Sequence, residues 1–169
     1  MEEQIVNRVK SSKLITIDLQ ELNPKNPRSE FDISILLDNG MILREKEFRE
    51  KVKNFNWDQF SNHYVAIVCK TNAIIPAWAP LLICTYLSEF SKKFVLGTLE
   101  ELENYILNEF ISNLDLLEYK DKPIVIKGCS EKNIPDNALV QLIQRLQPVV
   151  KSIFYGEACS SVPLYKRRK

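Results

Sequence analysis

Three of the chain's four cysteines stand where parallel β-strands are expected to end. Cys69 closes the apolar run 64–68, Cys129 follows the run 124–128, and Cys159 follows the run 149–155 and a Gly-Glu-Ala segment. In an open α/β sheet the carboxyl ends of the strands line the ligand crevice. Thiolates prefer zinc, copper(I) and iron–sulfur clusters, so three thiols at one such edge predict a metal or cluster site.

A fourth ligand for this site is expected from a carboxylate or from an exogenous group. Glu157 precedes Cys159 closely, and Asp18 lies near the end of the first strand-like run. Asp18 reaches the same edge only if its strand runs parallel to the others. The single histidine, His63, begins the strand that Cys69 ends, which separates the two by about 20 Å. We therefore expect His63 in a surface loop at the opposite rim.

The spacing of these cysteines is weakly specific, because the chain contains no C-x-x-C, C-x-x-H or ferredoxin-type run. A second interpretation is a small thiol enzyme that acts through Cys129 or Cys159. Lys127 or a helix N-terminus would lower the pKa of such a thiol, and Glu157 would serve as the base. A third interpretation is a protein-interaction domain whose cysteines are buried and inert. Whether the chain is an enzyme stays open at this point.

Composition and glycine pattern exclude several classes of protein. The chain's four glycines form no dinucleotide-binding, P-loop or nucleophile-elbow motif. The net charge of +1 indicates neither a nucleic-acid nor a membrane partner, although the last four residues, 166–169, are all basic. That tail is expected to be solvated, with contact to a polyanion as the alternative. No signal peptide or membrane span is expected, which predicts a cytoplasmic protein with reduced thiols.

The second part of the chain alternates strands with helices. Strands are expected over 64–69, 93–96, 123–127 and 149–155, and helices over 76–90, 98–117 and from Pro135 to about 147. Thr98 and Glu101 match a capping box. Three successive strand–helix–strand units predict a three-layer α/β fold, a mostly parallel sheet with helices on both faces. The strand-like run 14–19 is expected to join the same sheet.

The first part of the chain is less regular. Pro24 and Pro27 predict a loop, Asp32 is a plausible helix cap, and Phe48 and Val52 belong to the apolar stripe of an amphipathic helix over 45–55. The expected organisation is a single domain over 1–169. It comprises an irregular part (1–62), a strand–helix core (63–156), and a C-terminal loop and basic tail (157–169).

Several stretches of the chain resemble the bacterial family called domain of unknown function 2480. The resemblance lies in 64–69, 73–79, 126–130, 155–160 and 162–166, and includes the opening 5–9, so it spans nearly the whole chain. Genes of that family often lie near the sulfur-mobilisation system for iron–sulfur assembly. The resemblance itself implies little about function and carries no catalytic residues. The gene association slightly favours a metal or sulfur-handling accessory protein with a partner in iron–sulfur assembly. Ligand, substrate and oligomeric state remain open.

Overall fold

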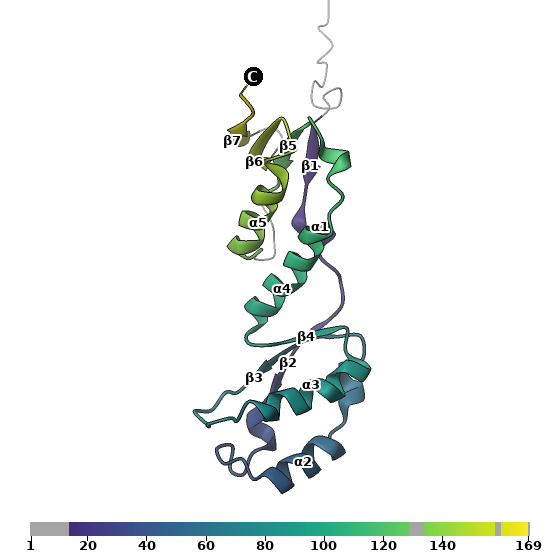
Figure 1. Cartoon of the computed structure of the whole chain (residues 1–169), viewed down its shortest axis with the longest axis vertical. Helices are drawn as coiled ribbons and strands as arrows, with labels where there is room; N and C mark the ends of the chain where they lie inside the picture. Colours follow the sequence, from purple (N-terminus) through teal and green to yellow (C-terminus); the bar gives the residue numbers. More distant parts are fainter. Residues whose placement is uncertain (1–13, 129–133, 158–159, 169) are drawn as a thin grey trace, which may run out of the picture. The chain divides into compact units, whose positions relative to one another are not determined.

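The strands of the protein are divided between two sheets in two compact units. The computed structural model describes residues 14–128, 134–157 and 160–168. Unit 1 comprises Met1–Pro24 and Ile106–Lys169, and unit 2 comprises Lys25–Tyr105. The predicted α/β class with mostly parallel strands is confirmed, whereas the expectation of one shared sheet is wrong. Assignment of the whole chain to one domain stays a prediction, and each unit is described by itself (Figure 1).

The sheet of unit 1 has the order β1-β5-β6-β7 in the described part of the chain. Its strands are β1 (Ile15–Ile17), β5 (Pro123–Ile126), β6 (Ser152–Glu157) and β7 (Ser160–Lys166). β1 and β6 both run parallel to β5, and β7 runs antiparallel to β6. The first strand therefore runs in the direction that Asp18 needs in order to reach the edge where β5 and β6 end.

β7 corrects the expectation of a C-terminal loop and tail from residue 157. Pro163 lies in the middle of this strand and pairs with Phe154, next to an irregularity in the register. Proline cannot donate to a sheet ladder and is rare in central strands. β7 is the last strand in the order of its sheet, and an edge strand tolerates a proline.

Both long helices of unit 1 pack on one face of its sheet. α5 (Asp136–Leu146) and the second half of α4 (Leu99–Ser112) share one core with alternate residues of the strands. Short helical turns, α1 (Leu19–Leu22) and η3 (Leu117–Tyr119), follow β1 and α4. The core residues include Ile17, Leu107, Ile111, Ile124, Ile126, Ala138, Leu142, Leu146 and Ile153.

The sheet of unit 2 has the order β2-β3-β4, and all its neighbouring strands are parallel. The strands are β2 (Arg28–Asp32), β3 (Tyr64–Val68) and β4 (Lys93–Leu96). β2 lies in the part of the chain that was expected to be irregular. Its sequence is mostly polar and lacks the apolar pattern that predicts a strand. The helices of this unit are η1 (Ile33–Leu36), α2 (Glu45–Asn54), η2 (Trp57–Phe60), α3 (Trp78–Phe90) and the first half of α4.

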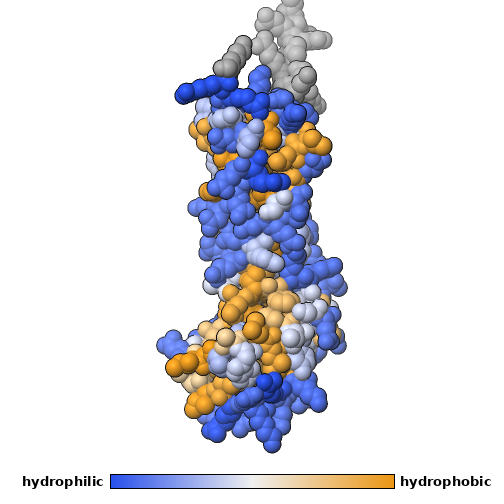
Figure 2. Space-filling view, viewed as in Figure 1, coloured by the Kyte–Doolittle hydropathy of each residue, from blue (hydrophilic) through white to orange (hydrophobic). Residues whose placement is uncertain are grey.

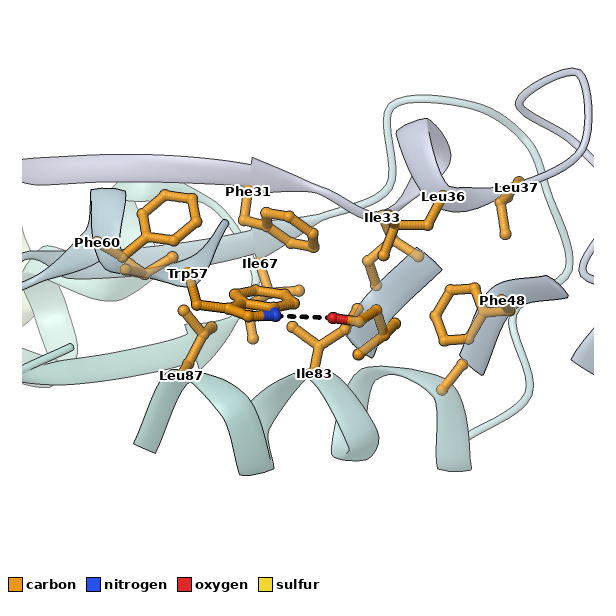
Figure 3. Close-up of a cluster of buried hydrophobic side chains, with 13 residues drawn as sticks. Phe31, Ile33, Leu36, Leu37, Phe48, Trp57, Phe60, Ile67, Ile83 and Leu87 are labelled. Carbon is orange, nitrogen blue, oxygen red and sulfur yellow. Dashed lines mark hydrogen bonds between the residues drawn. The ribbon is translucent and has the colours of Figure 1, made fainter. Parts of the chain in front are cut away.

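An aromatic cluster forms the core of unit 2 (Figure 3). The rings of Phe31 and Trp57 lie 5.1 Å apart, and Phe60 meets Phe31 edge-on at 5.9 Å. The Trp57 indole Nε1 donates to the Val52 carbonyl at 2.8 Å, so the buried polar end of this ring is satisfied. This bond also ties η2 to the end of α2.

The first half of α4 covers the opposite face of the unit 2 sheet. Arg28 and Tyr64 are register partners on that face, and the Arg28 guanidinium lies 5.1 Å from the Tyr64 ring centroid. Arg28 also pairs with Glu103 of α4 at 2.6 Å.

The predicted capping box at the start of α4 is confirmed. Thr98 N donates to Glu101 Oε2 at 2.7 Å, and Glu101 N donates to Thr98 Oγ1 at 3.2 Å.

The apolar helices of the described residues are short. None of them combines the length and the hydropathy required to cross a bilayer.

Candidate functional site

A buried carboxylate and a lysine meet at the carboxyl edge of the unit 1 sheet. Asp18 directly follows β1, and its Oδ1 accepts from Gln20 N at 2.8 Å, which caps α1. Its Oδ2 accepts from Lys127 Nζ at 2.8 Å. Lys127 directly follows β5, and the register Ile17 to Ile126 brings the two side chains to the same edge. The Asp18 side chain is 9% exposed and the Lys127 side chain 35%, so the carboxylate is better shielded from water than the ammonium group.

Hydrogen bonding holds both members of this pair in their charged forms. Burial raises the pKa of the Asp18 carboxyl, but the bonds from Lys127 and Gln20 N outweigh burial and lower it below 3.8. The Asp18 hydrogen bond raises the pKa of Lys127, and the nearby negative charges of Glu157 and Glu21 raise it further. Lys127 therefore stands as an ammonium group among three carboxylates.

A pocket of about 200 Å³ opens beside this pair. Polar groups from four segments line it together with three aliphatic side chains: Asp18, Leu19, Lys127, Gly128, Ile134, Asp136, Leu139 and Tyr155. α5 begins at Asp136, so the first turn of this helix contributes Asp136 and Leu139 to the wall. The volume suits a ligand smaller than a drug-sized molecule, for which pockets begin at about 300 Å³.

Gly128 allows Tyr155 to form one wall of this pocket. A Cβ at position 128 would lie 2.9 Å from two carbons of the Tyr155 ring, which is closer than van der Waals contact permits. Glycine therefore lets the aromatic ring of β6 lie directly against the exit of β5. The pocket offers a charge pair, a second carboxylate and a phenol at the place where open α/β sheets bind their ligands.

The structure brings only some of the predicted site residues to this edge. Glu157 ends β6, and its charge acts on Lys127, while Cys129 and Cys159 lie outside the described residues. Cys69 follows β3 in the sheet of unit 2, where its Sγ lies 3.5 Å from the carbonyl oxygen of Thr71. The argument that three thiols share one sheet edge therefore fails, because the three cysteines follow strands of two different sheets.

The described residues also give no support to a metal centre. Within 14–128, 134–157 and 160–168, no three histidine, cysteine, aspartate or glutamate side chains are grouped to hold a metal ion. His63 lies in the loop before β3, as expected, with its Nδ1 2.6 Å from Ser29 Oγ. Cys84 is partly buried in α3, and burial raises the pKa of its thiol.

The pairing of Asp18 with Lys127 was not anticipated from the sequence. The signals were present: Lys127 directly follows a buried strand, and Asp18 precedes the helical turn Leu19–Leu22, a position that favours a capping carboxylate. Asp136 and Tyr155 carried no such signal. Their position at the pocket depends on the packing of α5 and β6 against β5.

The fold and this edge define an α/β protein with two mostly parallel sheets and a small polar pocket at the strand ends of unit 1. The chain belongs to the family described as "Protein of unknown function (DUF2480)", which matches residues 3–167 and confirms the resemblance seen in the sequence. No curated protein and no solved structure matches the chain.

Proposed function

We propose that the protein binds a small polar ligand in the Asp18–Lys127 pocket and acts on it through the thiol of Cys129 or Cys159. The observation that carries this proposal is the ammonium group of Lys127 at a pocket wall, at the exit of β5. Gly128 lines the same pocket, and Cys129 is the next residue in the chain. A neighbouring cation stabilises a thiolate, which is the reactive form of cysteine.

Glu157 is the carboxylate that we assign as the assisting base. It ends β6, two residues before Cys159, and its charge contributes to the raised pKa of Lys127. Unit 1 itself contains no histidine, since His63, the only histidine of the chain, belongs to unit 2. A thiol reaction of this kind requires reduced cysteines, so we place the protein in the cytoplasm.

The test is the pH dependence of thiol alkylation in a Cys69→Ser/Cys84→Ser background, compared with further Cys129→Ser and Cys159→Ser variants. We expect one thiol to react with an apparent pKa below the value of about 8.5 of a free cysteine. Lys127→Met should raise that pKa, whereas the matched control Lys70→Met, in unit 2, should leave it unchanged. Both thiols reacting as free cysteines, regardless of Lys127, would support inert cysteines in an interaction domain instead.

A metal or sulfur-handling accessory protein is the second candidate function. β5 and β6 are neighbours in the sheet, and Cys129 and Cys159 follow them. Two thiolates with Glu157 would suit zinc, an iron–sulfur cluster or a bound sulfur species, delivered to a partner in iron–sulfur assembly. Protein purified without air or affinity-tag metal should then contain stoichiometric metal or sulfide. Cys129→Ser and Cys159→Ser should remove it, Cys69→Ser should retain it, and metal-free wild-type protein would eliminate this candidate.

A further inference from the structure

The rim of the unit 1 sheet opposite the pocket is strongly basic. It lies where β5 and β6 begin and where β7 ends. Figure 2 shows strongly hydrophilic side chains near the C-terminal end of β7. We call this region the basic rim and define it by its six cationic residues: Lys120, Lys122, Lys151, Lys166, Arg167 and Arg168.

Backbone hydrogen bonds hold cations from three separate segments next to one another. Lys151 N donates to the Lys122 carbonyl at 2.9 Å, and Arg167 N donates to the Lys151 carbonyl at 2.9 Å. Neighbouring strands lie about 4.8 Å apart, so Lys122, Lys151 and Arg167 form a row across three strands. All six rim residues except the half-buried Lys122 are exposed.

The positive charge of the basic rim is mostly unbalanced. Asp121 pairs with Arg167, but within the described ranges no carboxylate forms an ion pair with the other five cations. The two further carboxylates of the adjoining turn are Asp115 and Glu118, so six cations face three acids. The whole chain carries 23 basic and 22 acidic residues, so this excess is local. Like charges on neighbouring strands destabilise a sheet, and an anionic partner would relieve that repulsion.

An exposed leucine beside the cations indicates what kind of anion fits. Leu117 is 78% exposed at the start of η3, and its carbonyl accepts from Lys120 N at 3.3 Å. Protein interfaces combine apolar with charged side chains, whereas a phosphate backbone offers no apolar partner to an exposed leucine. Binding of single-stranded nucleic acid favours exposed aromatic rings, but Tyr119 beside the rim is only 8% exposed.

We propose that the basic rim docks an acidic, leucine-containing segment of a protein partner, with Leu117 as its apolar anchor. This inference goes beyond the proposed function, because the pocket lies at the other edge of the same sheet. Either proposal can fail while the other holds.

The experiment measures binding of a fluorescent Glu/Leu peptide and of its Glu/Ser counterpart at low ionic strength. The rim variant is Lys122→Gln/Lys151→Gln/Arg168→Gln. The matched control, Lys46→Gln/Lys53→Gln/Lys92→Gln, removes the same charge from exposed positions of unit 2. We expect the rim variant to raise Kd about tenfold and the control to change it less than about twofold.

The Leu117→Ser variant tests the contribution of the apolar anchor to binding separately from that of the positive charges. It should weaken binding of the Glu/Leu peptide and leave the weaker Glu/Ser peptide unaffected. The proposal is overturned if wild-type protein does not bind the Glu/Leu peptide, or if the rim and control variants lose equal affinity. It is also overturned if a DNA duplex competes more strongly than the peptide, which would assign the rim to nucleic acid. A retained circular dichroism spectrum and an unchanged urea unfolding midpoint by circular dichroism establish that the variants are folded.

Discussion

Two strand exits, one in each unit, are built from the same residue types and yet differ in what they offer a ligand. In unit 1, Asp18 follows β1, caps a helical turn and bonds to Lys127 after the neighbouring strand. In unit 2, Asp32 is the last residue of β2, caps η1 and accepts from the backbone N of Lys70, which follows the neighbouring strand.

The two aspartates differ in the partners that hold them. Asp32 accepts from two backbone N–H groups and from the Ser34 hydroxyl, while the Lys70 ammonium pairs with Glu30. Asp18 accepts from the backbone N of Gln20 and, unlike Asp32, from an ammonium group, and both side chains of that pair line the pocket. Asp32 therefore works as a structural cap, whereas Asp18 holds a cation at a cavity. Residue type at a strand exit does not by itself make a site.

The largest expected effect comes from the strands that lead into the two exits. Ile126→Ala and Ile67→Ala each empty a position at most 1% exposed, and each should lower the free energy of unfolding by about 2–5 kcal/mol. Urea unfolding followed by circular dichroism measures both. Trp57 and Trp78, the only tryptophans of the chain, lie in unit 2, so their fluorescence reports on that unit.

This pair of variants also tests whether the units unfold together. If they do, Ile126→Ala shifts the fluorescence transition as much as the circular dichroism transition. A loss below about 1 kcal/mol for either variant would contradict the burial on which the two-core description depends.

The next effect separates the two aspartates directly. Asp32→Asn keeps all three hydrogen bonds, since its amide oxygen accepts both N–H groups and its amide nitrogen can donate to Ser34. We expect a change of about 0.5 kcal/mol or less, because asparagine caps as well as aspartate. Asp18→Asn turns a donor toward the Lys127 ammonium and should cost about 1–2 kcal/mol in chemical unfolding at neutral pH. If Asp18→Asn and Asp32→Asn lowered the free energy of unfolding equally, the distinction between a capping aspartate and an aspartate paired with a lysine would be wrong.

Lowering the pH should reveal the same distinction between the two aspartates, through a smaller change in the free energy of unfolding. The pKa of Asp18 is lowered in the folded protein, mainly by Lys127 and Gln20 N against the opposing effect of burial. Ionised Asp18 therefore contributes its full stabilisation of the folded state above pH 3.8, the ordinary pKa of the carboxyl. This contribution is lost as the pH falls through the lower pKa of the folded protein. The stability difference between wild type and Asp18→Asn should thus shrink as the pH falls below 3.8. A difference that grows on acidification would reverse the assigned sign.

The smallest effect concerns the two lysines. Lys70 is 63% exposed, so Lys70→Met should leave the unfolding midpoint unchanged within error and should leave the pKa of Asp18 unaltered. Lys127→Met removes a hydrogen bond and a positive charge from Asp18, so the pKa of Asp18 should rise. Carboxyl titration by NMR measures both, and an unchanged Asp18 pKa in Lys127→Met would mean that the pair does not hold the carboxylate charged.

Local patterns predicted most of the elements of the fold. The apolar runs became β3, β4 and β5, the amphipathic stripe became α2, and the capping box starts α4 as expected. β2 and β7 escaped prediction because their sequences, Arg28–Asp32 and Ser160–Lys166, carry polar residues or a proline at edge positions. An edge strand needs fewer apolar residues than a central one, so its pattern is weak.

The catalytic and metal-ligand assignments made from the sequence stay predictions, since Cys129 and Cys159 lie outside the described residues. The carboxyl edge of the parallel strands, Asp18 and Glu157 were all anticipated, and the parallel direction of β1 satisfies the condition set for Asp18. Grouping Cys69 with the other two cysteines failed because it assumed one sheet. The pocket residues Asp136 and Tyr155 come from segments that only packing against β5 brings to the exit.

The sequence by itself determined the α/β class, the strand–helix alternation and the helix caps, because these depend on contacts between residues a few positions apart. Only the tertiary structure decided which strands pair. β1 pairs with β5 across more than 100 residues and β2 pairs with β3, so the chain forms two sheets rather than one. Any two apolar parallel strands can form the same ladder, so the choice between partners depends on the side-chain layers above and below them, which local sequence does not encode.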